Sequence, residues 1–595
     1  MFGMELRKPK MLDLRYNEMW NDWDGTGDAD PQEPVKYAHG QLVLSWKRLN
    51  VTVKTVTQKF FAPSTVSHKQ ILYNVSGNVQ CGSLLGIMGP SGSGKTTLMS
   101  TISHRTKGNF EGELLLNGRP VSEEVMIKIS GFVPQHDISF DQLTALEHLS
   151  LMAKLKMDRD TTEADLIEHV DHILLNDPPI LFCDEITTGL DSYSAAHIVN
   201  TLKSVARTGK IVVCTIHQPA SGVFGKFDDV ILLTEGRLAY QGPVTSVNRL
   251  FQKFSYECPN MFNEADYVIS ILNSEKETVK RDVEEMCKLS STDQQTDLNY
   301  DTFNNQKQLD YTQYLQKQHP KWTTQFTLIL DRSTKCFLRN YQTQLLELCT
   351  IMFLGIIISS PFANLQFDTK AVQNWEGFWL IFVINFVFHF SYSAIAMYQQ
   401  KFAIVHREVH NKVYPLSVYY MSELMIMIVW IMIKMLAYCI IAFTIVGADW
   451  GQKQLFLFFI LAVSAYSYGS LLSALFTRVE HTVIFATIND FVALPLSGAY
   501  LSFKSLPKTI YFLRHLSLFF LGCETVSIQF WENIESLPCV DPDNCLDSGK
   551  AVLNKYGYII EEFNSDMIIM ASFSIVASVV SYFGVLKRMK QQPAY

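Results

Sequence analysis

Hydrophobic and polar positions divide the chain into two unlike parts. Up to about residue 321, apolar runs of strand length alternate with charged stretches of helical period, a pattern typical of a soluble α/β domain. From about residue 326 onward, several apolar runs are long enough to cross a bilayer. They predict six spans, at 343–361, 376–398, 418–446, 454–476, 481–502 and 566–587. We therefore expect an N-terminal α/β domain followed by an all-α, six-helix transmembrane domain.

Changes in composition divide the first part further. Residues 1–40 are polar and acidic, which predicts a disordered lead-in without a signal peptide, so the first apolar helix would direct membrane insertion. Alternation at 42–53 predicts an edge strand at the beginning of an α/β domain that covers 41–245. Residues 246–325 turn polar and predict a partly flexible linker.

An amphipathic segment precedes the first span. At 326–340, the residues Arg332, Lys335 and Arg339 are spaced to share one face of a helix. Basic residues along one face are typical of a helix that lies on a bilayer surface. The sequence therefore predicts a connecting helix at the cytosolic face of the membrane.

Positive charges orient the transmembrane domain, which covers 341–595. Lysines and arginines follow the second, fourth and sixth predicted spans, and the positive-inside rule assigns these positions to the cytosol, together with the α/β domain. The acidic stretch 503–565 then faces the lumen or the exterior. It holds Cys539 and Cys545, which either form a disulfide in that compartment or remain free thiols.

The overall composition mainly excludes some kinds of architecture and ligand. The 595 residues are too many for a single core. The net charge of −8 offers no basic footprint for nucleic acid, so we expect no nucleic-acid partner. The eleven cysteines show no CxxC or His-rich spacing, which argues against a structural metal site.

One glycine-rich loop carries the candidate chemistry. It fits the pattern G-x-x-x-x-G-K-[ST] and lies between an apolar strand at 84–88 and a predicted helix start. Glycines let backbone N–H groups turn toward a polyphosphate, and the helix N-terminus adds its positive dipole. Lys95 would reach the β- and γ-phosphates, and the Thr96 hydroxyl would hold Mg²⁺. The predicted nucleotide-binding residues are Gly89, Pro90, Ser91, Gly92, Ser93, Gly94, Lys95, Thr96 and Thr97.

Five further residues follow this loop in a fixed order, and together they resemble the ATP-binding cassette of ABC transporters. The resemblance implies ATP and Mg²⁺ as ligands. Gln135 matches the Q-loop, which links bound Mg²⁺ to the membrane domain. Asp184 matches the Mg²⁺-binding aspartate, and Glu185 the base that polarises the attacking water. Asp191 matches the D-loop, and His217 the switch histidine at the γ-phosphate.

The chain departs from the cassette pattern at one motif. The family carries Leu-Ser-Gly-Gly-Gln between the Q-loop and the second Walker strand, where it clamps the ATP of the opposite cassette. No such peptide occurs between 136 and 176, and Gln135 and Asp184 are only 49 positions apart (184 − 135). The near match at 496–500 lies in a predicted span, and Ile186 stands where the family usually has proline. The helical subdomain is therefore expected to be truncated.

Two interpretations of this gap remain open. Either a skipped exon or a faulty gene structure removed part of the helical subdomain, or the subunit is naturally degenerate. In both cases the chain's own ATP could work against a partner's signature, whereas a homodimer should hydrolyse ATP poorly.

A cassette that precedes six spans resembles the G subfamily of ABC half-transporters. The segments 176–185 and 187–195 narrow this resemblance to the insect eye-pigment group of White, Scarlet and Brown, and most of all to Scarlet. It implies a heterodimer with a White-like subunit that moves a small aromatic solute, such as 3-hydroxykynurenine, across a pigment-granule membrane, a lysosome-related organelle. Transmission of ATP-driven closure is assigned to a coupling helix near 406–413.

Alternatives to this reading stay open. The chain could be a sterol or lipid exporter of the same subfamily, or a non-catalytic decoy subunit, and the plasma membrane is an alternative location. In the G subfamily, the substrate pocket lies where the second and fifth spans of both subunits meet. The resemblance therefore places the substrate path of this chain on its second and fifth predicted spans. The register assigns to this path Asn385, Phe388, Thr487, Phe491 and Leu494, with packing or lipid-facing roles as the alternative.

Overall fold

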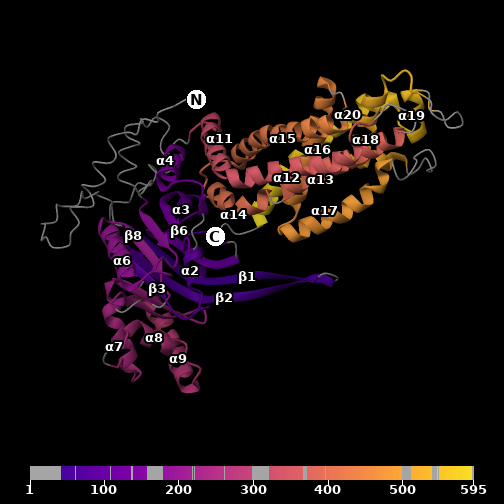
Figure 1. The fold of residues 1–595 in the computed structure, drawn as a ribbon. Helices are drawn as coiled ribbons and strands as arrows, with labels where there is room; N and C mark the ends of the chain where they lie inside the picture. The colour runs from indigo at the N-terminus through magenta and orange to yellow at the C-terminus, as the bar shows by residue number, and fades with distance from the viewer. Residues whose placement is uncertain are drawn as a thin grey trace, which may run out of the picture.

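A computed structural model describes most of the chain, with several segments left out. The described residues are 42–59, 62–106, 109–135, 139–156, 178–217, 219, 222–259, 262–297, 320–365, 371–395, 397–448, 451–498, 511–538, 546 and 548–591. In them an α/β domain precedes a bundle of long helices, which confirms the predicted fold class (Figure 1). The predicted lead-in at 1–40 lies outside the described residues.

The larger sheet has six strands in the order β10-β9-β3-β8-β7-β6. Its strands are β3 (Leu84–Met88), β6 (Ser130–Val133), β7 (Ile180–Cys183), β8 (Ile211–Thr215), β9 (Asp229–Thr234) and β10 (Arg237–Pro243). All pair in parallel except β10, which runs antiparallel to β9. β3, β7 and β8 are buried along their whole length, as expected for parallel strands covered on both faces. The glycine-rich loop therefore begins at the end of β3, an interior strand of this sheet.

A second, antiparallel sheet has the order β2-β1-β4-β5. Its strands are β1 (Val43–Lys59), β2 (Ala62–Gln80), β4 (Asn109–Leu116) and β5 (Arg119–Pro120). The expected edge strand at 42–53 belongs to β1, which pairs with β2 on one side and β4 on the other, so the edge assignment is wrong. Alternation reports that one face is buried, here through Leu44 and Trp46, but it does not report how many neighbours a strand has.

Helices surround these sheets. Those within the predicted cassette are α2 (Lys95–Ile102), α3 (Glu123–Ile129), α4 (Ala145–Lys156) and α6 (Ser192–Arg207), with 3₁₀ turns η1 (Phe224–Lys226) and η2 (Val244–Ser246). Three more helices occupy much of the expected linker: α7 (Val247–Lys253), α8 (Glu264–Leu272) and α9 (Glu277–Asp297). Phe251, Ile271 and Met286 from these helices are buried in the cassette core. The linker prediction for 246–325 is therefore wrong up to Asp297, because a polar composition concealed helices with one narrow apolar face.

The described residues of the second part of the chain form helices joined by short turns and irregular segments. Its helices are α11 (Trp322–Arg339), α12 (Tyr341–Ser359), α13 (Val372–Ile395), α14 (Met397–His410), α15 (Leu416–Val446), α16 (Gln452–Leu475), α17 (Val479–Ala493), α18 (Leu518–Trp531), α19 (Gly549–Tyr556) and α20 (Phe563–Gln591). The 3₁₀ turns are η4 (Ser360–Phe362), η5 (Pro495–Ser497), η7 (Tyr511–Leu516) and η9 (Ile560–Glu562). α11 covers the segment expected to connect the cassette to the first span.

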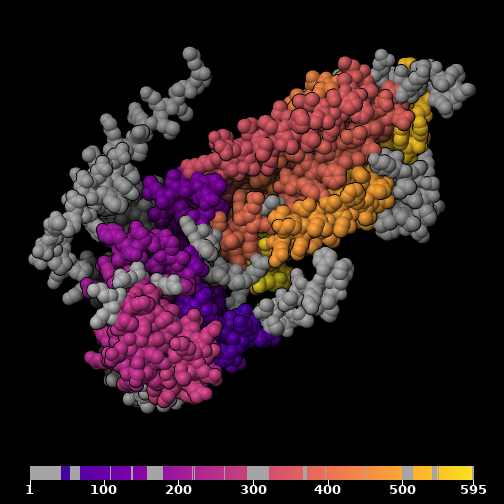
Figure 2. All heavy atoms as spheres, turned by 60° about the horizontal axis from the view of Figure 1, so that its bottom comes forward, coloured from indigo at the N-terminus to yellow at the C-terminus, as the bar shows by residue number. Residues whose placement is uncertain are grey.

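Within the described residues, five helical stretches are long and apolar enough to cross a membrane. They are Tyr341–Phe362, Val372–His410, Leu416–Val446, Gln452–Leu475 and Ile560–Gln591. Large apolar side chains on their outer surface remain exposed, such as Phe353 at 61% on α12 and Val576 at 59% on α20. A surface of this kind suits lipid rather than water. Figure 2 shows this bundle and the cassette as two distinct masses.

The remaining predicted span, 481–502, corresponds to α17, which has 15 residues and is followed by η5. A helix of that length is about 22 Å long, shorter than the hydrocarbon core of a bilayer. Residues 499–510 lie outside the described part of the chain, so a sixth span stays a prediction.

The acidic stretch 503–565 is more than an external loop. It contains α18, which is buried along most of its length and packs against α13, α16 and α20. The sequence did not predict this helix, because 14 apolar residues are too few for a span and the surrounding stretch is acidic. The candidate disulfide partners Cys539 and Cys545 lie outside the described residues.

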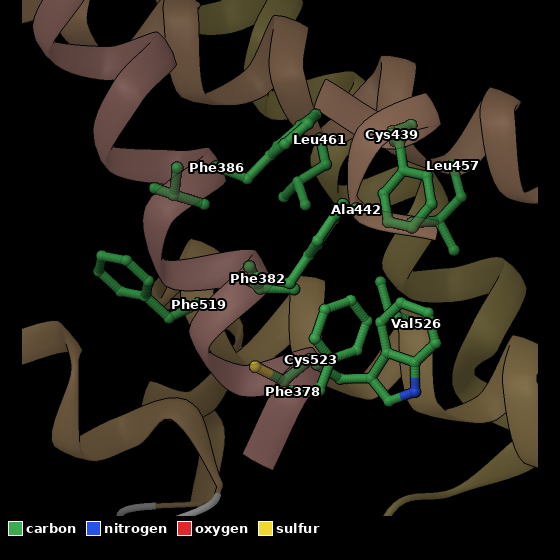
Figure 3. Packing of buried hydrophobic residues seen from close by; sticks show 14 of the residues in the cluster. Phe378, Phe382, Phe386, Cys439, Ala442, Leu457, Leu461, Phe519, Cys523 and Val526 are labelled. Atoms are coloured by element: carbon green, nitrogen blue, oxygen red, sulfur yellow. The ribbon is translucent and has the colours of Figure 1, made fainter. Parts of the chain in front are cut away.

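An aromatic core holds the bundle together (Figure 3). Phe378, Phe382 and Phe386 recur every four residues along α13, with successive ring centroids 5.8 and 5.6 Å apart. Gly469 on α16 lets the two backbones approach, because a Cβ there would lie 1.9 Å from the carbonyl oxygen of Ser391 on α13. α13 and α16 therefore form the centre on which the other helices pack.

Candidate functional site

The glycine-rich loop turns between β3 and α2 in a backbone conformation that requires glycine. Gly89, Gly92 and Gly94 have φ angles of 151°, 78° and 98°, a region that residues with a Cβ rarely adopt. At Gly89 a Cβ would also lie 2.1 Å from the carbonyl oxygen of Leu233. The loop conformation that exposes N–H groups to a phosphate thus follows directly from the sequence.

Lys95, the first residue of α2, folds back over this loop. Its Nζ donates hydrogen bonds to the carbonyl oxygens of Gly89 at 3.0 Å and Pro90 at 2.9 Å. Burial lowers the pKa of Lys95, while the nearby carboxylates of Glu185 and Asp184 act in the opposite direction. The ammonium is therefore held where a polyphosphate in the loop would replace its carbonyl partners.

Asp184 follows β7 and points toward α2. Its Oδ1 accepts hydrogen bonds from the hydroxyls of Thr96 at 3.2 Å and Thr215 at 2.5 Å. Burial raises the pKa of Asp184, and these two hydrogen bonds oppose the increase. Hydroxyl and carboxylate oxygens are the ligands that Mg²⁺ prefers, so this pair fits the predicted Mg²⁺ site.

Thr215 was not recognised from the sequence. It is the last residue of β8, and its hydroxyl accepts a hydrogen bond from the N–H of Glu185 at 2.8 Å while donating to Asp184. Its role becomes visible only through the pairing register, in which Cys183 lies opposite Cys214. Thr215 therefore fixes both acidic residues at once.

Glu185 has an unusual backbone. Its φ of 47° lies in the left-handed region, which costs free energy in a non-glycine residue and is concentrated at functional sites. Its Oε2 accepts a hydrogen bond from the Nε2 of Gln135 at 2.5 Å. Glu185, Lys95 and His217 line one cavity of about 620 Å³ beside the glycine-rich loop. The structure therefore brings together the three residues predicted to be catalytic, Gln135, Glu185 and His217.

The predicted D-loop residue has a local role in the described chain. Asp191 caps α6 by accepting the N–H of Ser194 at 2.6 Å, and this bond lowers its pKa. The cavity also has a wall that the sequence did not indicate, formed by Gln70, Ile71 and Tyr73 of β2 and by Glu235. No local motif marks these residues, because they reach the site through sheet packing. Residues 157–177, within the interval that lacks the signature, lie outside the description.

Charged contacts join the cassette to the connecting helix α11. Arg339 contacts Glu147 on α4 through two nitrogen–oxygen pairs, each 2.6 Å long. The hydrogen bond from Arg339 lowers the pKa of Glu147 to about 2, so the carboxylate stays charged until the pH falls toward that value. Lys412, after α14, contacts Glu124 on α3 at 2.7 Å. Arg339 and Glu147 thus form a bidentate ion pair, and Lys412 and Glu124 form a second ion pair between the membrane part and the cassette.

A buried arginine lies at the centre of this joint. Nη1 of Arg332 donates to Glu408 at 2.7 Å and Nη2 to the Tyr414 hydroxyl at 3.1 Å. Its guanidinium lies 4.5 Å from the ring centre of Phe140, which follows the Gln135 segment. The sequence predicted one basic face with Arg332, Lys335 and Arg339 on a helix at the bilayer surface; in the structure both arginines contact protein side chains.

The predicted substrate-path residues lie on α13, along α17 and, for Leu494, directly after α17, in different surroundings. The Phe388 ring packs 5.5 Å from Phe519 of α18, and the Thr487 hydroxyl lies 3.0 Å from that of Tyr392. Phe491 is 72% exposed on the outer surface. The side chain of Asn385 has a buried oxygen with no hydrogen-bond partner in the described structure. Together with Leu494, these residues stay a prediction.

The geometry around Thr215 predicts a specific defect. Thr215→Val keeps the shape of the side chain but removes both hydrogen bonds to the acidic pair, so Asp184 and Glu185 lose their orientation. We expect kcat for ATP hydrolysis, measured with a partner that carries the signature, to fall about 10- to 100-fold, with a higher Mg²⁺ concentration needed for half-activity. Thr215→Ser, which retains the hydroxyl, serves as the control and should recover most activity. Wild-type hydrolysis by the valine variant would contradict this role.

Comparisons with known proteins agree with the architecture. The family model "ABC transporter" matches residues 72–180, and two "ABC-2 type transporter" models match 217–293 and 324–531. Protein scarlet of Drosophila melanogaster is 28% identical over 88% of this chain and 87% of its own length. Protein brown and Protein white of the same organism are 27% and 26% identical, over 93% and 96% of this chain and 98% and 92% of theirs.

Among solved structures, a dimeric ATP-binding cassette in a post-hydrolysis state, bound to ADP and Pi, matches with 24% identity and a TM-score of 0.29, over 34% of this chain and 98% of that chain. The two kinds of family model follow one another in the order of the observed domains. The chain therefore combines an ABC transporter ATP-binding cassette with an ABC-2 type membrane domain, as an integral membrane protein whose cassette is an ATPase coupled to transport, and it is similar over most of its length to Scarlet, Brown and White.

Proposed function

We propose that the chain pairs with a White-like half-transporter and uses ATP to move a small aromatic solute across a pigment-granule membrane. By analogy with the group, the solute is a tryptophan-derived pigment precursor such as 3-hydroxykynurenine. The observation that carries the proposal is the hydrogen bond between Gln135 and Glu185. It connects the residue assigned to hydrolysis with the segment that continues to Phe140 and the membrane joint.

The site residues supply hydrolysis in distinct ways. Glu185 accepts a proton from the attacking water, and its strained backbone and the contact with Gln135 fix the position of its carboxylate. Lys95 binds the β- and γ-phosphates, and His217 holds the γ-phosphate from the other wall. Mg²⁺, held by Thr96 and Asp184 with Gln135 nearby, would neutralise the negative charge that develops on the phosphates.

Motion reaches the membrane through α4 and the segment after α14. Met152 and Leu155 of α4 pack in one apolar cluster with Ile329 of α11 and Val413. Arg339 of α11 also pairs with Glu147 of α4, and Arg332 of α11 pairs with Glu408 of α14. Because these ion pairs link the three helices, movement of α4 on nucleotide binding displaces α11 and α14 together. This segment overlaps the expected coupling helix at 406–413.

The absence of a signature peptide determines which composite site can work. Lys95, Asp184, Glu185 and His217 are all present, so ATP bound to this chain can be completed by the signature of a partner. ATP bound to the partner would meet no signature here. We therefore expect activity from a heterodimer with one competent site. A second candidate function, a decoy subunit that pairs without export, is favoured by this same gap.

Transport in vesicles tests the proposal. Vesicles that hold this chain with a White-type partner should take up 3-hydroxykynurenine only with ATP, and Lys95→Met should abolish uptake because the phosphates lose their cation. A labelled sterol and a labelled phospholipid serve as substrate controls. Export of a control lipid in place of 3-hydroxykynurenine would support the lipid-exporter alternative. Co-purification of the two chains without any Lys95-dependent transport would support the decoy alternative.

A charge exchange tests the joint. Glu147→Arg or Arg339→Glu alone places like charges in contact, so we expect a several-fold loss of transport, with nucleotide binding retained. The double exchange restores opposite charges and should recover transport. Lys335→Glu is the matched control, since Lys335 pairs with Asp331 of the same helix at 2.7 Å and does not join the cassette. Equal defects in the double variant and the single variants would exclude a role for this pair.

A further inference from the structure

Three carboxylates converge at the end of the bundle that is remote from the cassette, where α18, α19 and α20 meet (Figure 1). Glu524 belongs to α18, Glu562 to η9 and Asp566 to the first turn of α20. One oxygen from each residue lies within 4.8 Å of the others. The fold thus brings Glu524 beside Glu562 and Asp566, which are four positions apart, and the three form a compact set of oxygen atoms.

Two of these carboxylates are buried without adequate partners. Asp566 is 0% exposed, and neither of its oxygens has a hydrogen-bond partner in the described part of the chain. Glu524 is also 0% exposed; its Oε1 accepts the N–H of Ile559 at 3.0 Å, whereas its Oε2 has no such partner there. Burial of an unpaired carboxylate is costly unless an opposite charge compensates it. Asp566 and Glu524, which carry these unpartnered oxygens, are both members of the cluster, and their burial points to a positively charged ligand.

Two basic side chains border the cluster in the described part of the chain. Arg514 forms an ion pair with Glu562 and balances one carboxylate. The ring of His515 accepts a hydrogen bond at Nε2 from Arg514 Nε at 3.1 Å, and its Nδ1 lies 3.5 Å from Asp566 Oδ1. Among the described residues, Arg514 and His515 are the basic side chains that contact the three carboxylates.

We propose that Glu524, Glu562 and Asp566 bind a divalent cation of the Ca²⁺ type. The donors are exclusively carboxylate oxygens, which select hard cations over zinc or copper. Ca²⁺ tolerates irregular geometry and takes six to eight oxygen ligands, so water would complete the shell. The bound ion links α18 to α20 and stabilises the packing of the buried helix against the bundle.

Direct binding to the full-length chain in neutral-lipid nanodiscs tests this proposal. Tb³⁺, a luminescent substitute for Ca²⁺, should bind and be sensitised by Tyr558, which precedes Ile559 at the site, and Ca²⁺ should displace it. Glu524→Gln and Asp566→Asn each remove one charged ligand and should weaken Ca²⁺ binding by about tenfold or more. Glu561→Gln, an exposed neighbour in η9, is the matched control and should bind as the wild type does.

Thermal unfolding provides a second readout that separates binding from misfolding. Each substitution removes a buried charge with little change in volume, so the variants should unfold in chelator at or above the wild-type temperature. Added Ca²⁺ should raise the unfolding temperature of the wild type and of Glu561→Gln, but not of the two ligand variants. The proposal is overturned if the wild type binds no Ca²⁺, as expected if Glu524 and Asp566 share a proton instead. It is equally overturned if the ligand variants respond to Ca²⁺ as strongly as the wild type.

Discussion

The buried guanidinium of Arg332 is the interaction on which the joint between the two parts of the molecule depends. A charge that is 2% exposed requires fixed partners, and Arg332 has them in Glu408 and Tyr414, with the Phe140 ring above its plane. Glu408 and Tyr414 belong to the membrane part, as Arg332 does, whereas Phe140 belongs to the cassette. The ion pair therefore fixes the guanidinium in place, and the Phe140 ring docks on it, so separation of the two parts would expose both the ring and the guanidinium face.

In the nucleotide site, too, single side chains fix the positions of several others. A single hydroxyl, that of Thr215, orients both acidic residues, and Gln135 contacts the Glu185 carboxylate directly. The left-handed backbone of Glu185 is maintained by these contacts rather than by local preference. A short path therefore runs from Glu185 through Gln135 and Phe140 to Arg332. The contacts between Glu185 and Gln135 and between Phe140 and Arg332 join described residues, and 136–138, between Gln135 and Phe140 in the sequence, lie outside the described residues.

Local chemistry made some of these features predictable and nonlocal packing concealed others. The glycine-rich loop was evident because its φ angles and close approach to Leu233 permit only glycine at Gly89. The apolar runs of five spans were evident because bilayer thickness sets their length. Thr215 and Tyr73 were not, since their positions depend on strand register and sheet packing. α18 was missed because burial by neighbouring helices, not its own length, determines where it lies.

Hydrolysis at a single composite site provides the most direct test of this account. In a heterodimer whose partner carries a disabled phosphate-loop lysine, only the site with Lys95 and Glu185 of this chain can hydrolyse ATP. The account predicts continued turnover, completed by the partner's signature, and loss of that turnover with Glu185→Gln. Absence of turnover while this chain still binds ATP, or turnover that survives Glu185→Gln, would contradict it.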